Sequence, residues 1–420
     1  MNITWKFKLV AAAAALAVTT GVQAQQEIRI GVIYPLTGSL ASSGAEMRDA
    51  LEFAADIVNN GLKGVPELPF SAGGGLTGLK GAKIKLVFAD HQGNPQVGAS
   101  EAERLISQEH VVALMGAYNS NVTQTASQVA ERDKIPFLNA ESSSPTLTQR
   151  HFKYFFRTTP DDALFVRNAF DFMKDIEQTR HIKIGSVATL AENTLFGDQA
   201  AKLQQQYAAA QGFNMVKQVS YPAKTTQLTS EVQTLKAANP TVLLQSSYSE
   251  AILSMKTYKE LGYLPDMLIA NDAGFADTEF IKTLGKDAEY VISREVWALD
   301  IGDKKPIIKK VDDLFKARYK IDFTGNSARS FTGLLVLADA INRAGSTDPE
   351  AIRKALIATN IPSSALIMPW KGVKFDETGQ NTQGAGILVQ VRDGKYSTVW
   401  PFDLASKDVV WPMPKWDARK

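Results

Sequence analysis

Short apolar runs alternate with longer amphipathic stretches along most of this chain. The short runs are rich in β-branched residues, and the longer stretches repeat their apolar positions with the period of a helix, which is typical of βα units on parallel sheets. Strands are predicted at 28–34, 84–89, 111–116, 135–138, 182–187, 215–220, 242–245 and 267–270. Helices are predicted between them at 44–59, 96–109, 122–132, 197–211, 227–238 and 250–261.

The predicted strands fall into two sets of four, and strands and helices alternate in the same order in both sets. Ile28–Gly31 resembles Ile182–Gly185, and Val112–Tyr118 resembles Val242–Tyr248. Such matches are typical of an internal duplication. The pattern therefore predicts an α/β protein with two Rossmann-like lobes, each built on a parallel-sheet core.

Beyond Val291 the pattern changes. Amphipathic helices are predicted at 306–319, 331–344 and 348–358, and β-like runs follow at 386–391 and 396–400. These segments have to complete both lobes, so we expect the chain to cross between the lobes more than once and to form a multi-crossover hinge. The glycine-rich stretch 61–81 lacks periodicity and is interpreted as a surface insertion.

The amino-terminal segment has the order of features found in secretory signal peptides. Lys6 and Lys8 precede a continuous apolar run at 9–18, and small residues follow up to Ala24. The run is about half the roughly 20 residues needed to span a bilayer. We expect residues 1–24 to be removed after Ala24 and the mature protein to be soluble and exported; a buried amino-terminal helix is the alternative.

Composition narrows the possible classes of protein. With 420 residues, 45% of them hydrophobic and 21% charged, the chain can form two or three domain cores. Lys6 and Lys8 carry the only charges before Ala24, so cleavage lowers the 46 basic residues to 44, equal to the 44 acidic ones. A neutral mature chain has no general electrostatic attraction to nucleic acid or anionic membranes, so neither is expected as a partner.

No catalytic or metal-binding set stands out in the sequence. The absence of cysteine excludes disulfides, thiolate nucleophiles and cysteine metal sites. The four histidines are scattered, and no phosphate-binding loop or hydrolase motif occurs. We therefore predict no cofactor, no metal and no enzymatic activity. An exported enzyme whose catalytic residues are dispersed along the sequence is an alternative.

Polar residues follow the third and fourth predicted strands of both sets. They form the loops Tyr118–Asn121, Glu141–Ser144, Tyr248-Ser249 and Asn271-Asp272. In open parallel sheets, ligands bind outside the carboxyl ends of the strands. Ser120 and Asn121 precede a helix, whose free N–H groups favour an anion, and Asp272 could accept an ammonium group. Helix capping explains each residue singly; together they describe a site for a zwitterion.

At these residues the chain resembles the periplasmic substrate-binding proteins of branched-chain amino acid ABC transporters, the leucine/isoleucine/valine-binding family with the type I binding-protein fold. The resemblance runs from Glu27 to Trp400. The segments of this chain that resemble the family are 30–31 with 36–38, Asp90 with 94–95, 116–120 with 123–127, 143–148, 156–159, Phe196-Gly197 and 271–274. Their order and spacing, more than any single motif, carry the resemblance.

The family resemblance implies a division into lobes and a set of ligand contacts. The first lobe is expected at 25–158 plus 293–370 and the second at 159–292 plus 371–420, with crossovers near Thr158, Ser293 and Trp370. Ser120 and Ser143 would hold a ligand carboxylate, and the Glu141 backbone carbonyl and the Asp272 carboxylate an ammonium. The complete predicted contact set is Ser43, Tyr118, Asn119, Ser120, Glu141, Ser142, Ser143, Phe196, Tyr248 and Asp272.

The resemblance also implies a function. We expect a monomeric receptor that closes on an amino acid, branched-chain or related, and delivers it to an inner-membrane ABC permease. Phe196, Ser43 and Glu141 depart from the family pattern, so an amide, urea or aromatic acid remains an alternative ligand. A sensor module is a further alternative, and ligand identity separates the leading possibilities.

Overall fold

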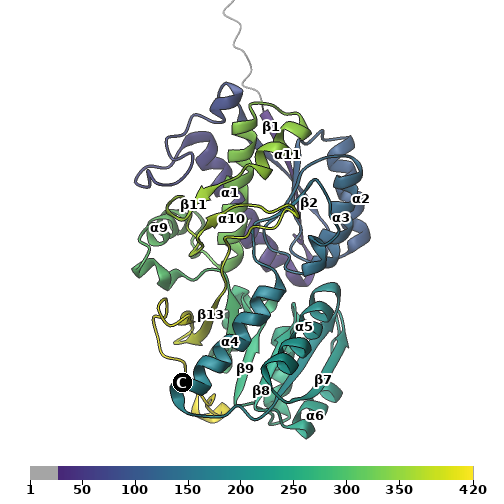
Figure 1. Cartoon of the computed structure of the whole chain (residues 1–420), viewed down its shortest axis with the longest axis vertical. Helices are drawn as coiled ribbons and strands as arrows, with labels where there is room; N and C mark the ends of the chain where they lie inside the picture. The colour runs from purple at the N-terminus through teal and green to yellow at the C-terminus, as the bar shows by residue number, and fades with distance from the viewer. Residues whose placement is uncertain (1–26, 420) are drawn as a thin grey trace, which may run out of the picture.

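The computed structural model describes residues 27–419, so the predicted signal peptide lies outside the described residues. Figure 1 shows two lobes stacked along the long axis of the molecule, with β1 in one lobe and β7 in the other. Each lobe has its own sheet with helices packed on it. This arrangement confirms the α/β fold class with two parallel-sheet cores.

The first lobe is built on a five-stranded sheet in the order β2-β1-β3-β4-β5, with every neighbouring pair parallel. Its strands are β1 (Glu27–Tyr34), β2 (Lys83–Asp90), β3 (Ala113–Gly116), β4 (Phe137–Asn139) and β5 (Phe155–Arg157). Its helices are α1 (Ala41–Asn60), α2 (Pro95–Ser107), α3 (Ser120–Arg132), α9 (Ile307–Tyr319), α10 (Gly325–Ala344) and α11 (Pro349–Ile357). A short hairpin of β11 (Ile361–Pro362) and β12 (Gly372–Val373) completes it.

Successive side chains of β1 enter different cores of the first lobe. Ile30 and Val32 belong to the core that contains α1 and α10, whereas Ile33 belongs to the core that contains α2 and α3. A strand places successive side chains on opposite faces, so a strand covered on both sides is apolar throughout. This explains why β1 carries no charged residue from Ile30 to Tyr34, where it is buried throughout.

The second lobe is built on a seven-stranded sheet in the order β14-β13-β10-β9-β8-β6-β7. Its strands are β6 (Val187–Asn193), β7 (Met215–Pro222), β8 (Val242–Ser246), β9 (Met267–Ala270), β10 (Ile292–Glu295), β13 (Ile387–Arg392) and β14 (Lys395–Trp400). Strands β6 to β10 pair in parallel, and β13 and β14 add an antiparallel edge. Its helices are α4 (Asp162–Arg180), α5 (Leu195–Gln211), α6 (Thr229–Ala238), α7 (Glu250–Glu260) and α8 (Thr278–Leu284).

One predicted strand was wrong. The alternation Ile182-Lys183-Ile184 predicted a strand at 182–187, but β6 begins at Val187 and continues to Asn193. The sequence of β6 contains two alanines and few β-branched residues, so its local pattern favours no strand. Burial on both faces between β7 and β8 makes it a strand. The proposed sequence match therefore aligns Ile28–Gly31, which lies in strand β1, with Ile182–Gly185, which lies in a loop.

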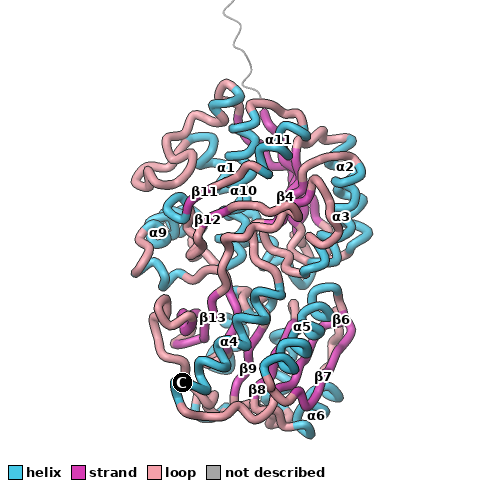
Figure 2. The backbone as a smooth tube through the Cα atoms, in the orientation of Figure 1, coloured by secondary structure: helices cyan, strands magenta, loops and turns pink. Residues whose placement is uncertain are grey.

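The chain passes between the lobes after β5, after β10 and before β13 (Figure 2). Two of these passages lie side by side, because the Arg157 N–H donates to the Gly379 carbonyl over 2.8 Å and the Asn381 N–H donates to the Arg157 carbonyl over 2.9 Å. Multiple crossovers confirm the predicted hinge architecture. The predicted lobe boundaries at 158, 293 and 370 remain a prediction.

Candidate functional site

The loops that follow the strands of both sheets meet in a cavity between the lobes. We call it the inner cavity, and it is lined by Tyr118, Ser120, Glu141, Ser143, Phe196, Tyr248, Asp272, Ala273, Arg294 and Arg329. Tyr118, Ser120, Glu141 and Ser143 follow β3 and β4 of the first lobe, and Phe196, Tyr248 and Asp272 follow β6, β8 and β9 of the second. The fold thus brings together these seven of the ten residues predicted as ligand contacts.

The other three predicted contacts do not line the inner cavity. The Ser43 hydroxyl donates to Asp277 Oδ2 over 2.5 Å. The Ser142 hydroxyl donates to the Tyr118 carbonyl over 2.9 Å, which joins two loops of the first lobe. Asn119 is adjacent in sequence to two lining residues but faces a neighbouring cavity.

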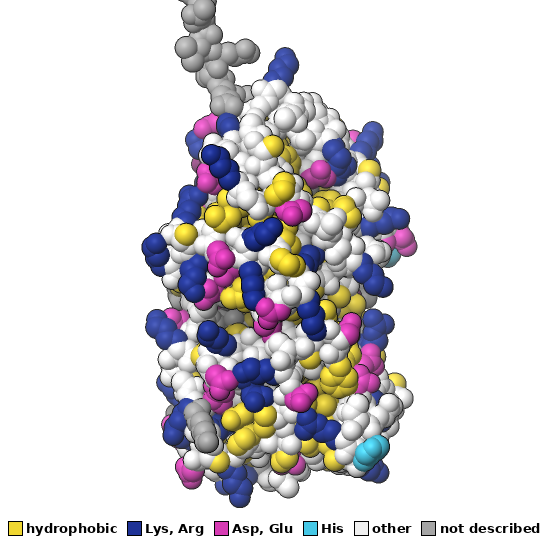
Figure 3. Space-filling model, turned by 90° about the vertical axis from the view of Figure 1, so that its left-hand side faces the viewer, with side chains coloured by type: hydrophobic (Ala, Val, Ile, Leu, Met, Phe, Trp, Pro, Cys, Tyr) yellow, Lys and Arg dark blue, Asp and Glu magenta, His cyan; other side chains and the backbone are white. Residues whose placement is uncertain are grey.

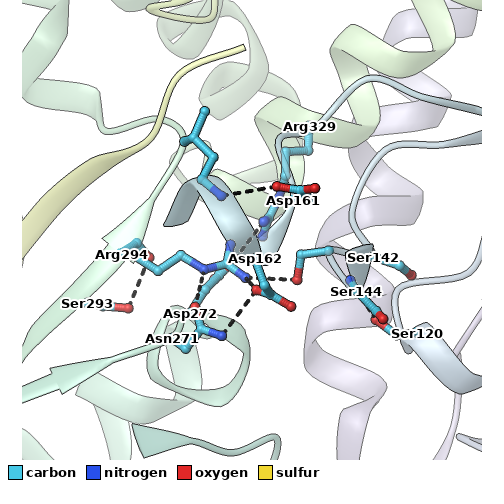
Figure 4. Close-up of polar contacts among 12 residues, drawn as sticks. Ser120, Ser142, Ser144, Asp161, Asp162, Asn271, Asp272, Ser293, Arg294 and Arg329 are labelled. Atoms are coloured by element: carbon cyan, nitrogen blue, oxygen red, sulfur yellow. Dashed lines mark hydrogen bonds and ion pairs between the residues drawn. The ribbon is translucent and has the colours of Figure 1, made fainter. Parts of the chain in front are cut away.

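Asp272 is held by two buried arginines. Arg294 Nη1 donates to Asp272 Oδ2 over 2.7 Å, and Arg329 Nη1 donates to the same oxygen over 2.6 Å. Arg294 also donates through Nε to Asn271 Oδ1 and lies 3.6 Å from Asp162 (Figure 4). A carboxylate without such partners would be too costly to bury, so the arginines allow Asp272 to lie in the cavity wall.

The arginines also determine which carboxyl groups are ionised. Burial acts to raise the pKa of Asp272, but the charges of Arg329 and Arg294 outweigh it and hold that pKa below its ordinary value. Burial and the nearby Asp272 raise the pKa of Glu295 well above its ordinary value. The surroundings therefore favour the ionised form of Asp272 and the protonated form of Glu295.

Glu141 is fixed in orientation by two hydroxyl groups. Tyr34 Oη and Ser330 Oγ each donate to Glu141 Oε1 over 2.7 Å. Burial raises the pKa of the Glu141 carboxyl, and these two hydrogen bonds oppose that rise. Its second oxygen, Oε2, is left for another partner, so the carboxyl side chain of Glu141, in addition to its backbone, belongs to the cavity wall.

Several polar atoms of the cavity-lining residues are buried without a hydrogen-bond partner. Glu141 Oε2 is such an acceptor and Arg329 Nε such a donor; Asp272 Oδ1 and Tyr118 Oη also have no close partner, although the Glu295 and Ser43 side chains lie near those two residues. Buried polar groups in proteins are almost always paired, and each unpaired one costs about 1–3 kcal/mol. Their presence around one cavity is what a site for a polar ligand requires.

The amino-terminal end of α3 lies at the first-lobe side of the cavity. No side chain caps this helix, and the Ser120 N–H donates to Tyr248 Oη of the second lobe over a long 3.4 Å. Free N–H groups at a helix start attract anions. Because the contact with Tyr248 is at the limit of hydrogen-bond length, a carboxylate could replace it.

Aromatic rings form one wall of the cavity. The Tyr248 ring lies 5.6 Å from the Tyr118 ring and 5.1 Å from the Phe196 ring, measured between centroids. Tyr118, Asp272 and Ala273 also have positive φ angles of 71°, 59° and 54°. Left-handed backbone at non-glycine residues is costly and gathers at functional sites, which agrees with a ligand site here.

Direct hydrogen bonds join the lobes around the cavity. Arg294 Nη2 donates to Ser143 Oγ over 3.2 Å. At the rim, the Ser42 and Ser43 hydroxyls donate to Asp277, and the Thr278 hydroxyl donates to Glu46 Oε1 over 2.7 Å. The lobes are therefore in direct contact around the cavity in this structure.

Sequence reasoning missed Arg294 and Arg329. Arg294 and Glu295 are the last two residues of the fully buried β10, and apolar residues stand on both sides of them at 291–292 and 296–298, so the charged pair could have marked a buried ion-pair network. Arg329 lies two residues before the helix start that periodicity predicted at Phe331, but α10 begins at Gly325 and buries it. No local pattern connects either arginine to Asp272.

Three further observations concern the described residues as a whole. Within residues 27–419, no cluster of histidine and carboxylate side chains has the composition of a metal site, and no helix is long and apolar enough to cross a membrane. On the face drawn in Figure 3, basic and acidic side chains are interspersed over both lobes.

Comparisons with known proteins agree with this architecture. The family described as periplasmic binding protein matches residues 27–395. The Leu/Ile/Val-binding protein homolog 7 of Brucella suis is 29% identical over 420 residues, covering 96% of this chain and 99% of that protein.

Two solved structures show the same fold. The leucine-binding protein LivK of Thermotoga maritima superposes with a TM-score of 0.74 at 20% identity, covering 88% of this chain and 97% of its own. A Rhodopseudomonas palustris solute-binding protein in complex with benzoate also has a TM-score of 0.74, at 17% identity, covering 89% and 95%. With the family match spanning nearly the whole described chain, the protein belongs to the family of periplasmic binding proteins, which are solute receptors.

Proposed function

We propose that this protein is the periplasmic receptor of an ABC importer and binds an α-amino acid in the inner cavity. The observation that carries the proposal is the set of unpartnered buried atoms around that cavity. Glu141 Oε2 has no hydrogen-bond donor, and Asp272 has the neighbouring Glu295 carboxyl as its one donor besides the two arginines. An ammonium group supplies three donors and a positive charge, and it can satisfy both carboxylates.

The carboxylate of the same ligand has partners on the opposite lobe. The Ser120 N–H at the start of α3 is held only by the long contact with Tyr248, and the Ser120 and Ser143 side chains line the cavity. A carboxylate there would gain charge-assisted hydrogen bonds and the favourable end of the helix dipole. A zwitterion thus offers an ammonium group to the carboxylates of the site and a carboxylate to its N–H and hydroxyl groups.

Closure of the lobes explains how such a ligand is retained. Ser120, Ser143 and Glu141 belong to the first lobe, and Asp272, Tyr248 and Phe196 to the second, so a bound amino acid would join the two. Excluding water strengthens its charged hydrogen bonds. Two charge-assisted contacts and an aromatic wall suffice for a micromolar dissociation constant, about 8 kcal/mol. The closed receptor would then deliver the ligand to a membrane permease.

An aromatic carboxylic acid is the second candidate, and two observations favour it. Tyr118, Phe196 and Tyr248 form an aromatic wall, and Arg294 and Arg329 lie beside it. However, both arginines are already bonded to Asp272. A benzoate-like ligand also lacks a donor for Glu141 Oε2, so this atom would stay unpaired.

A thermal-shift screen of the mature protein followed by calorimetry tests the proposal. The ligands are L-amino acids, their decarboxylated amines, their amides, and aromatic acids. We expect at least one L-amino acid to raise the melting temperature and to bind about tenfold or more tightly than its amine or its amide. Binding of benzoate-type acids without any amino acid would overturn the proposal in favour of the second candidate.

A further inference from the structure

A second cavity of about 190 Å³ adjoins the inner cavity and is also formed by both lobes. We call it the outer chamber. It is lined by Thr37, Gly38, Ser39, Leu40, Gln92, Gly93, Asn119, Asn121, Glu192, Thr194, Ala223, Lys224, Tyr248, Ser249 and Glu250. Tyr248 lines both spaces.

Two chain segments form a common wall of the two spaces. Along 118–121, Tyr118 and Ser120 line the inner cavity, whereas Asn119 and Asn121 line the outer chamber. After β6, Thr194 lines the outer chamber and Phe196 the inner cavity. The spaces are therefore separated by the thickness of one chain and by the Tyr248 side chain, whose hydroxyl contacts the first lobe at the Ser120 N–H, over 3.4 Å, and at the Asn119 side chain.

The charged groups of the outer chamber are predominantly acidic. Glu192 and Glu250 stand close together, and Lys224 is the one cation among the residues that line it. Glu192 Oε2 accepts the Tyr248 N–H over 3.2 Å, and Glu250 Oε1 accepts the Lys224 N–H over 2.6 Å. Independently of this pair, the buried Asn119 Oδ1 in the same wall has no hydrogen-bond partner and needs a donor.

We propose that the outer chamber binds a cationic group at the far end of the ligand side chain, so that the substrate class is an α-amino acid with a basic side chain. The inference rests on the proposed amino-acid site in the inner cavity. The ligand's α-groups occupy that cavity, and its side chain passes Tyr248 into the outer chamber. There an ammonium or guanidinium group donates to Glu192, Glu250 and Asn119.

Proton exchange accompanies this mode of binding. Burial and the adjacent Glu250 raise the pKa of Glu192 to about 8, while Lys224 acts to lower it. The other titratable groups that act on this pair are Tyr221 and Tyr248, which stay neutral. Glu192 is therefore mostly protonated at pH 7, and a ligand cation displaces that proton because two ionised carboxylates are then balanced by two cations.

Lysine and norleucine are a matched pair of ligands for the test, since they share the α-groups and a straight side chain and differ in the terminal ammonium. In calorimetry at pH 7, we expect lysine to bind about tenfold or more tightly than norleucine. Titrations in buffers of different ionisation enthalpy should show release of about one proton per lysine and none for norleucine.

Glu192→Gln keeps an oxygen for the Tyr248 N–H but cannot ionise. We expect it to abolish proton release and to lower the ratio of lysine to norleucine affinity about tenfold. Glu260→Gln, at an exposed position at the end of α7 in the same lobe, is the matched control and should leave that ratio unchanged. If norleucine bound as tightly as lysine, the inference would be overturned and the amino-acid site would stand. If neither ligand nor any other amino acid bound, the proposed function itself would be overturned.

Discussion

Arg329 of the first lobe donates to Asp272 Oδ2 of the second lobe over 2.6 Å. The two residues are 57 positions apart in the sequence and belong to α10 and to the loop after β9. Asp272 was expected to meet a ligand ammonium directly, but one of its oxygens is already shared by Arg329 and Arg294. Asp272 is thus a contact between the lobes as well as a candidate ligand contact.

Asp272→Asn should destabilise the protein and weaken amino-acid binding. The change removes the only full negative charge bonded to both arginines, and breaking a buried ion pair on one side costs about 3–5 kcal/mol. Urea unfolding would measure the loss of stability and calorimetry the loss of affinity. Asp408→Asn, at an exposed position, is the control. An Asp272→Asn protein with unaltered stability and affinity would remove Asp272 from both roles.

Ser120→Ala should weaken binding of an amino acid about tenfold, because a hydrogen bond to a charged group contributes about 1.5–3 kcal/mol. Binding of the decarboxylated amine should be unaffected by the substitution. Calorimetry of both ligands with wild type and variant measures this difference. If the substitution weakened the amine and the amino acid equally, Ser120 would have no role at the carboxylate.

Tyr34→Phe should lower the free energy of unfolding by about 1–2 kcal/mol, because it removes one of the two donors to the buried Glu141 Oε1. Ser330→Ala removes the other donor. The double variant should lose more than the sum of the single losses, since Glu141 would then be buried without either partner. Denaturant unfolding of all four proteins gives the coupling, and strictly additive losses would contradict it.

Glu46→Gln should remove a pH dependence of stability between about pH 4.5 and 7. Burial and the adjacent Asp277 raise the pKa of Glu46 from 4.5 to about 7. The folded protein therefore holds a proton in this range that the unfolded chain has lost. The stability that this proton contributes is fully present below pH 4.5. The free energy of unfolding then declines by about 3 kcal/mol as the pH rises to 7.

The measurement is the free energy of unfolding at pH 5 and pH 7.5 for wild type, Glu46→Gln and the exposed control Glu67→Gln. We expect Glu67→Gln to follow the wild type. Because Asp277 of the second lobe helps to raise the pKa of Glu46 of the first, closure should also be more favourable at the lower pH. A Glu46→Gln protein with the same pH dependence as the wild type would show that Glu46 does not titrate in this range.

Local pattern predicted most of the fold. The strand predicted at 267–270 is β9 with the same bounds, and the strand predicted at 242–245 is one residue shorter than β8. These segments are buried on both faces, so an apolar run bounded by polar residues identifies them without knowledge of the rest of the chain. β6 was misplaced because its sequence has no strand preference of its own and depends on its neighbours in the sheet.

The amino-acid sequence by itself determined the two-lobed α/β architecture and the polar loops at the strand ends, because periodicity and loop chemistry are properties of short segments. Only the tertiary structure decided which of those loops share a cavity and which atoms in it remain unpartnered. The arginines bonded to Asp272 lie 22 and 57 residues beyond it, and electrostatic pairing depends on distance in space, which no local pattern records.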